Sequence, residues 1–120
     1  MRKGFTLLEL IIVIIVIGVL ASLALPGFGK ARESALEKEA QANLRLISAA
    51  EKIYHMEYNA YFTGTDLVVI NNNLKLSLPA QNWSYAITSA APGTAFTAQA
   101  TRGAKELCIN ETEVDPYTCP

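Results

Sequence analysis

Residues 5–28 read FTLLELIIVIIVIGVLASLALPGF, and this stretch decides the fold of the N-terminal half of the chain. Glu9 is its only charged residue. About 20 apolar residues, in a helix that rises about 1.5 Å per residue, are long enough to span a bilayer. A carboxylate inside such a segment costs about 2.5–3.5 kcal/mol on insertion scales, so residues of this kind usually have a function and a partner. The stretch therefore predicts a membrane-spanning helix with one functional acid near its start.

A short basic leader, Met1-Arg2-Lys3-Gly4, precedes this stretch. Positive charges in front of an apolar span favour a cytoplasmic N-terminus, so the rest of the chain is predicted to be exported. An ordinary cleaved signal peptide is the alternative, and Ala21-Ser22-Leu23-Ala24 would be its weak cleavage site. The length of the run, the charge of Glu9 within it and the helical pattern behind it argue against this alternative.

The chain continues from residue 30 to residue 58 without Gly or Pro. Its apolar residues recur at steps of three and four, which is typical of one face of an α-helix. We therefore expect the membrane helix to continue as an amphipathic helix, which is too long for a small globular domain and indicates a role in assembly. Leu46 and Ile53 are predicted to widen the apolar face. The face itself consists of Leu36, Ala40, Leu44, Ile47, Ala50, Tyr54 and Tyr58.

Residues 59–120 are predicted to form a small head, which gives the chain an α+β fold. Asn59 is expected to end the long helix in a left-handed conformation, because Asn tolerates positive φ. The turn Thr63-Gly64-Thr65-Asp66 is expected to open a short helix over residues 67–70, and Asn71-Asn72-Asn73 is predicted to be a second turn. Alternating apolar residues then predict an antiparallel meander packed on the amphipathic helix, with strands over residues 83–88, 95–102 and 107–110.

Composition argues against several functional classes. A formal net charge of −1, spread evenly, gives no basic surface for nucleic acid, so no nucleic-acid partner is predicted. The single histidine, His55, has no second His or Cys near it in the sequence and is interpreted as a surface or helix-end residue. No Ser-His-Asp, paired-carboxylate, P-loop or zinc arrangement is present. We therefore predict no enzymatic activity, no catalytic residue and no cofactor, and we interpret most of the aromatic residues as core.

The run Gly4-Phe5-Thr6-Leu7-Leu8-Glu9-Leu10, behind Arg2 and Lys3, resembles the processing site of the type IV pilin and pseudopilin family. The resemblance implies that a membrane prepilin peptidase cleaves between Gly4 and Phe5, and that Phe5 becomes the N-methylated mature N-terminus. It also implies that Glu9 pairs with the α-amino group of Phe5 in a neighbouring subunit. The rest of the chain is similar to the family only in plan, with a long helix, a small sheet and a C-terminal disulfide loop.

The helix of this family has a segment that melts in assembled filaments, and the part from Gly18 to Pro26 resembles it. Gly lowers helix propensity by about 1 kcal/mol relative to Ala. Pro lacks an N–H donor and clashes with the preceding turn. Both residues are therefore predicted to be weak points of the helix.

The resemblance implies an organisation in four parts: a leader over residues 1–4, a transmembrane and assembly helix over 5–29, its amphipathic continuation over 30–58, and a globular head over 59–120. The implied partners are further copies in a helical filament, the prepilin peptidase, an inner-membrane assembly platform, minor pilins and, before assembly, the lipid bilayer. The expected location is the inner membrane, crossed once with a cytoplasmic N-terminus, and then an extracellular pilus or a periplasmic pseudopilus.

Cys108 and Cys119 lie near the end of the chain. In an exported domain an even pair of cysteines predicts a disulfide. Glu111, Glu113 and Asp115 lie inside the loop that this bond would close. The acidic loop of major pseudopilins binds calcium, so a calcium site is an alternative here; a solvated acidic loop is the commoner explanation, and no metal site is predicted.

The leading hypothesis is a structural subunit of a type IV pilus filament. The alternatives are a pseudopilin of a type II secretion system and a ligand-binding minor pilin for DNA uptake or adhesion. The cysteine pair favours a pilin, because the major pseudopilin usually has a calcium loop without a disulfide. The even spread of charge offers no exposed patch for a ligand-binding minor pilin, and Glu9 favours a subunit of the filament shaft.

Overall fold

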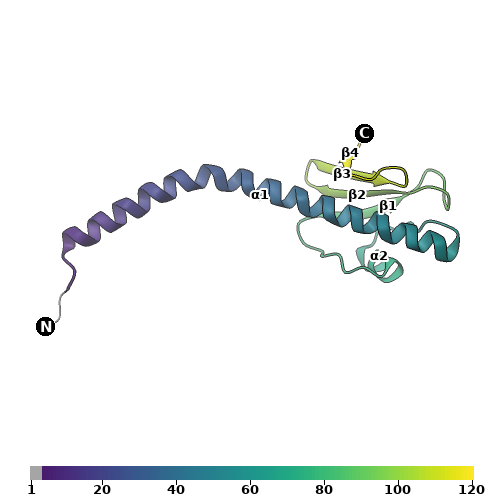
Figure 1. Ribbon diagram of the computed structural model, residues 1–120, viewed down its shortest axis with the longest axis horizontal. Coiled ribbons are helices and arrows are strands. Elements are labelled where there is room, and N and C mark those ends of the chain that lie inside the picture. Colours follow the sequence, from purple (N-terminus) through teal and green to yellow (C-terminus); the bar gives the residue numbers. More distant parts are fainter. Residues whose placement is uncertain (1–3) are drawn as a thin grey trace. The chain divides into compact units, whose positions relative to one another are not determined.

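The computed structural model describes residues 4–120, apart from the side chain of Pro26. Met1, Arg2 and Lys3 of the predicted leader lie outside the described residues. The chain divides into two compact units, one that ends at Ala35 and one that comprises Leu36–Pro120, and helix α1 contributes to both. The elements follow in the order α1 (Leu7–Tyr58), α2 (Leu67–Leu74), β1 (Ser84–Thr88), β2 (Thr97–Arg102), β3 (Lys105–Asn110) and β4 (Tyr117–Thr118), which confirms the predicted α+β class (Figure 1).

The first unit contains the N-terminal part of α1. The helix begins at Leu7, two residues later than predicted, and its helical conformation continues through Gly18 and Pro26. Within it, Leu7–Leu25 is long enough and apolar enough to cross a membrane. None of these 19 residues is buried inside the chain. The predicted melting of the segment from Gly18 to Pro26 stays a prediction.

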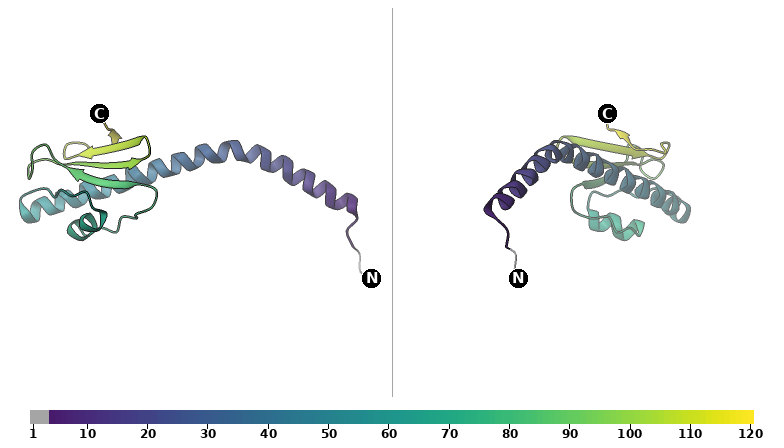
Figure 2. Two further views of the ribbon diagram at one scale, coloured as in Figure 1. Left: turned by 180° about the vertical axis from the view of Figure 1, so that it is seen from behind. Right: turned by 60° about the vertical axis from the view of Figure 1, so that its left-hand side comes forward.

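In the second unit, α1 packs against one face of a four-stranded antiparallel sheet with the order β1-β2-β3-β4, and α2 lies beside them (Figure 2). The predicted helix face supplies this core, because Leu36, Ala40, Leu44, Ile47 and Ala50 are all buried. Tyr54 is partly buried and packs against the core, whereas Tyr58 is 63% exposed.

The prediction for Leu46 and Ile53 was wrong. Their side chains are 52% and 60% exposed, so they do not widen the buried face. Consecutive residues of an α-helix are rotated by about 100° around its axis. Leu46 is therefore turned well away from the buried Ile47, and an apolar side chain at that angle cannot reach the sheet.

The sheet is a meander whose register sets its two faces. Alternate residues of β1, β2 and β3 point toward α1, as the pairs Tyr85–Ala100 and Ala98–Ile109 show. A tight turn joins β2 to β3 after Arg102, and Gly103 occupies it at φ 61°, where a residue without Cβ is favoured. The strand β4 was not predicted, because two residues are too few for a pattern.

Helix α2 is longer than predicted. Asp66 caps it through a hydrogen bond from the amide of Val68 at 2.9 Å, as the turn signal indicated. Asn71-Asn72-Asn73 was predicted to be a turn, but these residues are helical and α2 ends at Leu74. The side chain of Asn71 binds both the amide and the carbonyl of Leu78, at 3.0 and 3.2 Å. Partners outside the helix therefore stabilise a helical Asn that would otherwise favour a turn.

The second unit holds α1 at the point where this unit begins. The Trp83 indole Nε1–H donates to the carbonyl of Leu36 at 2.9 Å, and both residues are buried. Next to it, the Asn82 side chain donates to Glu39 Oε2 at 3.2 Å. A buried indole N–H needs an acceptor, so this contact fixes where the sheet meets the helix.

The predicted disulfide between Cys108 and Cys119 is confirmed, with 5.2 Å between the Cα atoms. It ties the last residues to β3, beside the short pairing of β4 with Leu107 and Cys108. A strand pairing of two residues is too weak to hold a chain end in place. The disulfide is therefore the main attachment of the C-terminal residues to β3.

Replacing both cysteines by serine should lower the free energy of unfolding of the second unit by about 2–3 kcal/mol, because the cross-link restricts the unfolded chain. Thermal unfolding of the full chain in detergent, followed by circular dichroism, measures this effect. Wild-type protein in reductant is the control and should behave like the variant. Equal melting temperatures for the variant and the oxidised wild type would contradict a stabilising role of the bond.

Candidate assembly interface

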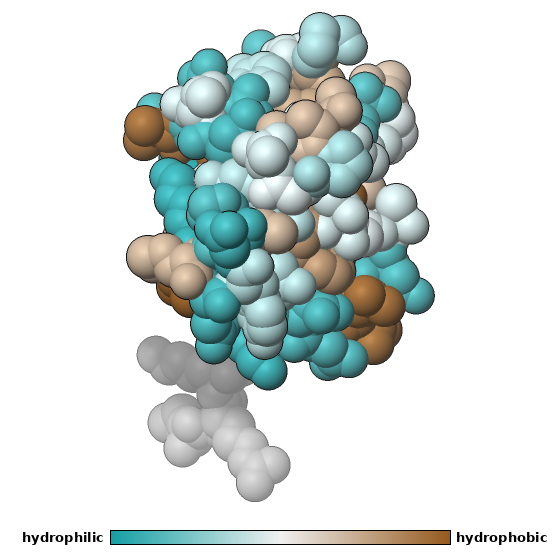
Figure 3. Space-filling model, turned by 90° about the vertical axis from the view of Figure 1, so that its right-hand side faces the viewer, coloured by the Kyte–Doolittle hydropathy of each residue, from teal (hydrophilic) through white to brown (hydrophobic). Residues whose placement is uncertain are grey.

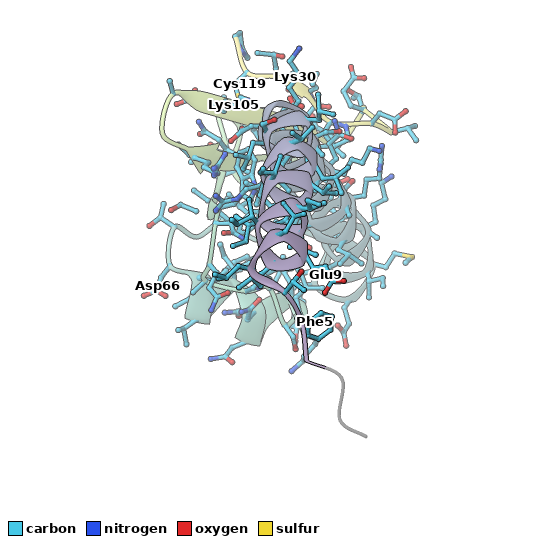
Figure 4. The ribbon with its side chains drawn as sticks, turned by 90° about the vertical axis from the view of Figure 1, so that its left-hand side faces the viewer. Phe5, Glu9, Lys30, Asp66, Lys105 and Cys119 are labelled. Atoms are coloured by element: carbon cyan, nitrogen blue, oxygen red, sulfur yellow. A yellow bond between two sulfur atoms is a disulfide. The ribbon has the colours of Figure 1, made fainter. Side chains whose placement is uncertain are left out.

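The first turn of α1 places Glu9 in a specific hydrogen-bonded arrangement. The amide of Thr6 donates to Glu9 Oε2 at 3.1 Å, and the amide of Glu9 donates to Thr6 Oγ1 at 3.2 Å. This reciprocal pair is a capping box, which satisfies two amides that a helix start leaves without helical partners. Figure 4 shows Phe5 and Glu9 together at this end of the helix.

Sequence reasoning missed the cap, although the signal was present. Thr6-x-x-Glu9 in front of an apolar run has the spacing of a capping box. The cap gives Glu9 a role within its own chain. It occupies Oε2, and a carboxylate has further lone pairs with which Oε1 can accept other donors.

The apolar span presents large and small side chains. Ala21, Ala24, Leu25 and Phe28 line a shallow apolar hollow on the helix surface. At Gly18 no atom lies within 4 Å of where a Cβ would stand. Small residues on a membrane helix let a second helix approach closely. The hydroxyl of Ser22 donates to the carbonyl of Val19 at 2.8 Å, so this polar group is satisfied within the helix.

The second unit also exposes an apolar stripe on α1, away from its core. Leu46, Ile53 and Met56 are 52%, 60% and 79% exposed, and Ala49 lies between them. Their steps of three, four and three residues place them on one side of the helix. We call Leu46, Ala49, Ile53 and Met56 the outer stripe. By contrast, the surface of this unit around the C-terminal end of α1 is mostly hydrophilic, and its apolar side chains form small separate patches (Figure 3).

Two of the three acidic side chains of the C-terminal loop, those of Glu111 and Asp115, have protein partners. The Arg45 guanidinium donates to Asp115 Oδ1 at 2.9 and 3.2 Å, and Glu111 Oε2 accepts the amide of Phe96 at 3.1 Å. Both groups of the ion pair are exposed, so it contributes at most about 1 kcal/mol. Among the residues that the structure describes, no three acidic, His or Cys side chains gather where they could hold a metal ion.

The aromatic residues near the end of α1 pack mainly against one another. The ring of His55 stacks on Tyr61 with 4.4 Å between centroids, and Tyr61 contacts the buried Phe96 at 5.0 Å. Tyr54 lies 5.8 Å from Phe62. His55 is thus a helix-end residue held by ring stacking, as its isolation in the sequence indicated.

Comparisons with known proteins show to which family this chain belongs. The family model of the prokaryotic N-terminal methylation motif matches residues 1–25. The chain is 32% identical over 130 aligned positions to the type IV wide pilus major component PilA4 of Thermus thermophilus, which covers 98% of this chain and 97% of that protein. The chain belongs to the type IV pilin and pseudopilin family.

Other family members match only the N-terminal half. The type IV major pilin protein PilA of Myxococcus xanthus is 41% identical over 60 residues, which cover half of this chain and 27% of that pilin. The type II secretion system core protein G of Pectobacterium carotovorum is 37% identical over 60 residues, which cover half of this chain and 38% of that pseudopilin. No solved structure gives a significant match.

The outer stripe should contribute little to the stability of the second unit. Ile53→Ala should change its free energy of unfolding by less than about 0.5 kcal/mol, because the side chain is mostly exposed. Ile47→Ala, on the buried face of the same helix, is the matched control and should cost about 2–5 kcal/mol. Guanidinium unfolding of the full chain in detergent measures both. Similar losses for the two variants would show that the outer stripe belongs to the core.

Proposed function

We propose that this chain is a structural subunit of a type IV pilus, inserted in the inner membrane as a single-pass protein and then polymerised into a helical filament through α1. The observation that carries the proposal is the span Leu7–Leu25, which is entirely exposed in the described structure and has no charged residue except Glu9. Such a surface is stable in lipid or against similar helices, and not in water. A filament core built from these spans gives the subunit an apolar environment after it leaves the membrane.

The pilus is favoured over the type II secretion pseudopilus by where the likeness extends. The match to a wide pilus component runs through the head, whereas the match to core protein G stops at about half of the chain. The head also holds its C-terminal loop with a disulfide and with the contacts of Glu111 and Asp115. A loop fixed in this way has no need of a bound calcium ion.

Processing is the switch for assembly. Removal of residues 1–4 by a prepilin peptidase, with methylation of Phe5, creates a positive amine one residue before the capped first turn. Leader residues keep that amine in a peptide bond, so an uncleaved chain cannot form an ion pair there. The peptidase, the inner-membrane assembly platform and minor pilins are the partners that this route requires.

Native filaments should contain chains that begin at Phe5. Intact mass and N-terminal sequencing of sheared filaments measure this, and the mass should include one added methyl group. Gly4→Val should leave a membrane-bound precursor and no filaments, because a branched side chain at the cleaved bond does not fit a site selective for Gly. Filaments whose subunits retain Met1, or begin behind Ala24, would contradict the proposed processing.

The charge of Glu9 has a second role, in pairing with a neighbouring subunit. Its Oε2 serves the cap, and its Oε1 is available to the Phe5 amine of the neighbour. An unpaired carboxylate at the edge of an apolar phase is costly, and a nearby amine offsets much of that cost. The pair fixes how far one subunit is displaced along the next, since only one register brings the two groups together.

Two substitutions separate the cap from the charge. Glu9→Gln keeps the hydrogen bond to Thr6, because Gln also serves in a capping box, but it removes the negative charge. If the ion pair drives assembly, this variant should insert and be cleaved, but its filament yield should fall at least about tenfold. A tenfold change corresponds to about 1.4 kcal/mol per pair. The measurement is sheared-filament yield relative to the membrane pool.

Thr6→Ala is the matched control, because it removes the Thr6 hydroxyl from the cap and leaves the charge of Glu9 in place. It should reduce filament yield far less than Glu9→Gln. Normal filaments from Glu9→Gln, together with a strong defect in Thr6→Ala, would show that Glu9 acts only as a cap.

A further inference from the structure

Glu51 is a fully buried acid in the interior of the second unit. It lies on α1 beside the core residues Ile47 and Ala50, and none of its surface is exposed. One carboxyl oxygen, Oε2, accepts the amide of Phe62 at 2.8 Å. The other oxygen, Oε1, is buried and has no hydrogen-bond partner among the described residues. Nothing in the proposed filament contacts accounts for this group.

The amide that Glu51 binds belongs to residues 59–66, which we call the connecting segment because they join α1 to α2. Backbone bonds hold this segment elsewhere as well. The amide of Tyr61 donates to the carbonyl of Gly93 at 3.2 Å, and Gly64 exchanges two bonds with Ile87 of β1, at 2.9 and 2.8 Å. Between these attachments to the sheet, the hydrogen bond from Phe62 to Glu51 joins the connecting segment to a side chain of α1.

The charged and titratable groups of the adjoining elements do not neutralise Glu51. On α1 these groups are Lys52, Tyr54, His55, Glu57 and Tyr58, and on the connecting segment they are Tyr61 and Asp66. His55 stacks on Tyr61, Tyr54 packs on Tyr58, and Asp66 caps α2. None of them forms an ion pair or hydrogen bond with Glu51 in the described structure. The carboxyl group therefore depends on a single amide.

Burial favours the neutral form of an acid that has one hydrogen-bond donor. The pKa of Glu51 is raised from 4.5 to about 7, because the effect of burial outweighs that of the hydrogen bond from Phe62, which lowers the pKa. An ionised Glu51 needs more donors than the closed structure supplies. Water can provide them only when the packing above Oε1 opens.

We propose that Glu51 is a proton-dependent latch, which holds the connecting segment against α1 when protonated and releases it when ionised. The proposal goes beyond filament formation and does not depend on it, because every group involved lies within the second unit of one chain. It makes the surrounding pH a determinant of local order at this end of α1.

The sign of the pH effect follows from linkage. The pKa in the closed state is raised, so the closed state binds more protons than the open state between pH 4.5 and about 7. The closed state is therefore most favoured below pH 4.5, and this advantage is lost as pH rises through 7. Between pH 5 and pH 8 the opening equilibrium should increase by roughly 50- to 100-fold at most.

Amide hydrogen exchange of the full chain in detergent micelles tests the latch. Rates are converted to protection factors, which removes the intrinsic effect of pH on exchange. In wild type, the protection factor of Phe62 should fall between pH 5 and pH 8 by tens of fold, whereas that of Ile109 in β3 should change far less. In Glu51→Gln, which stays neutral, the protection factor of Phe62 should be nearly the same at both pH values.

Glu57→Gln is the matched control, since Glu57 is an exposed acid on the same helix, and it should behave like wild type. Unchanged protection of Phe62 in wild type, or an equal fall in Glu51→Gln, would overturn the latch. So would an equal fall at Ile109, because it would indicate global unfolding. If Glu51→Gln does not fold, the Glu51 carboxyl carbon is titrated by NMR in wild type: a midpoint near 7 supports the latch, and one near 4.5 overturns it.

Discussion

None of the described residues covers the apolar surface of Leu7–Leu25, and this constraint governs the rest of the structure. Burial of one Leu or Ile side chain is worth about 1.5–3 kcal/mol. Because most residues of this span are apolar, its exposure to water is very unfavourable. The core of the second unit uses α1 only from Leu36 onward. The chain thus separates a part that folds on itself from a part that needs lipid or other subunits, although one helix supplies both.

Glu9 places a single carboxylate at the N-terminal end of this apolar span. Lipid alone would select against Glu9, because its charge opposes insertion. The capping box shows one compensation within the chain, since Glu9 satisfies the amide of Thr6. An amine from a neighbouring subunit would be a second compensation, one that appears only after processing and only in one register. Together they explain how a residue that is costly in a membrane can still serve the helix and the filament.

Much of the fold could be predicted because helix periodicity and turn chemistry are local signals. The bounds of α1, the buried face from Leu36 to Ala50 and the left-handed Asn59 were of this kind. The predicted turn over Asn71-Asn72-Asn73 was wrong because tertiary contacts outweigh the local preference there. Asn71 is helical because Leu78 satisfies its side chain, and the carboxyl group of Glu51 accepts the amide of Phe62 from the connecting segment. Two signals in the sequence were missed. Glu51 lies seven residues after Leu44 and four after Ile47, so the helical period places it on the buried face. The spacing of Thr6 and Glu9 likewise indicated the cap.

We propose that the exposed span of α1 becomes the filament core and that Glu9 sets its register. A helical reconstruction of purified filaments by electron cryo-microscopy tests this most directly, because it places every subunit. The account predicts that Leu7–Leu25 lie at the filament axis and that each Phe5 amine lies within about 4 Å of the Glu9 carboxylate of a neighbour. Filaments held together by their heads alone, or a Phe5 amine far from any carboxylate, would contradict it.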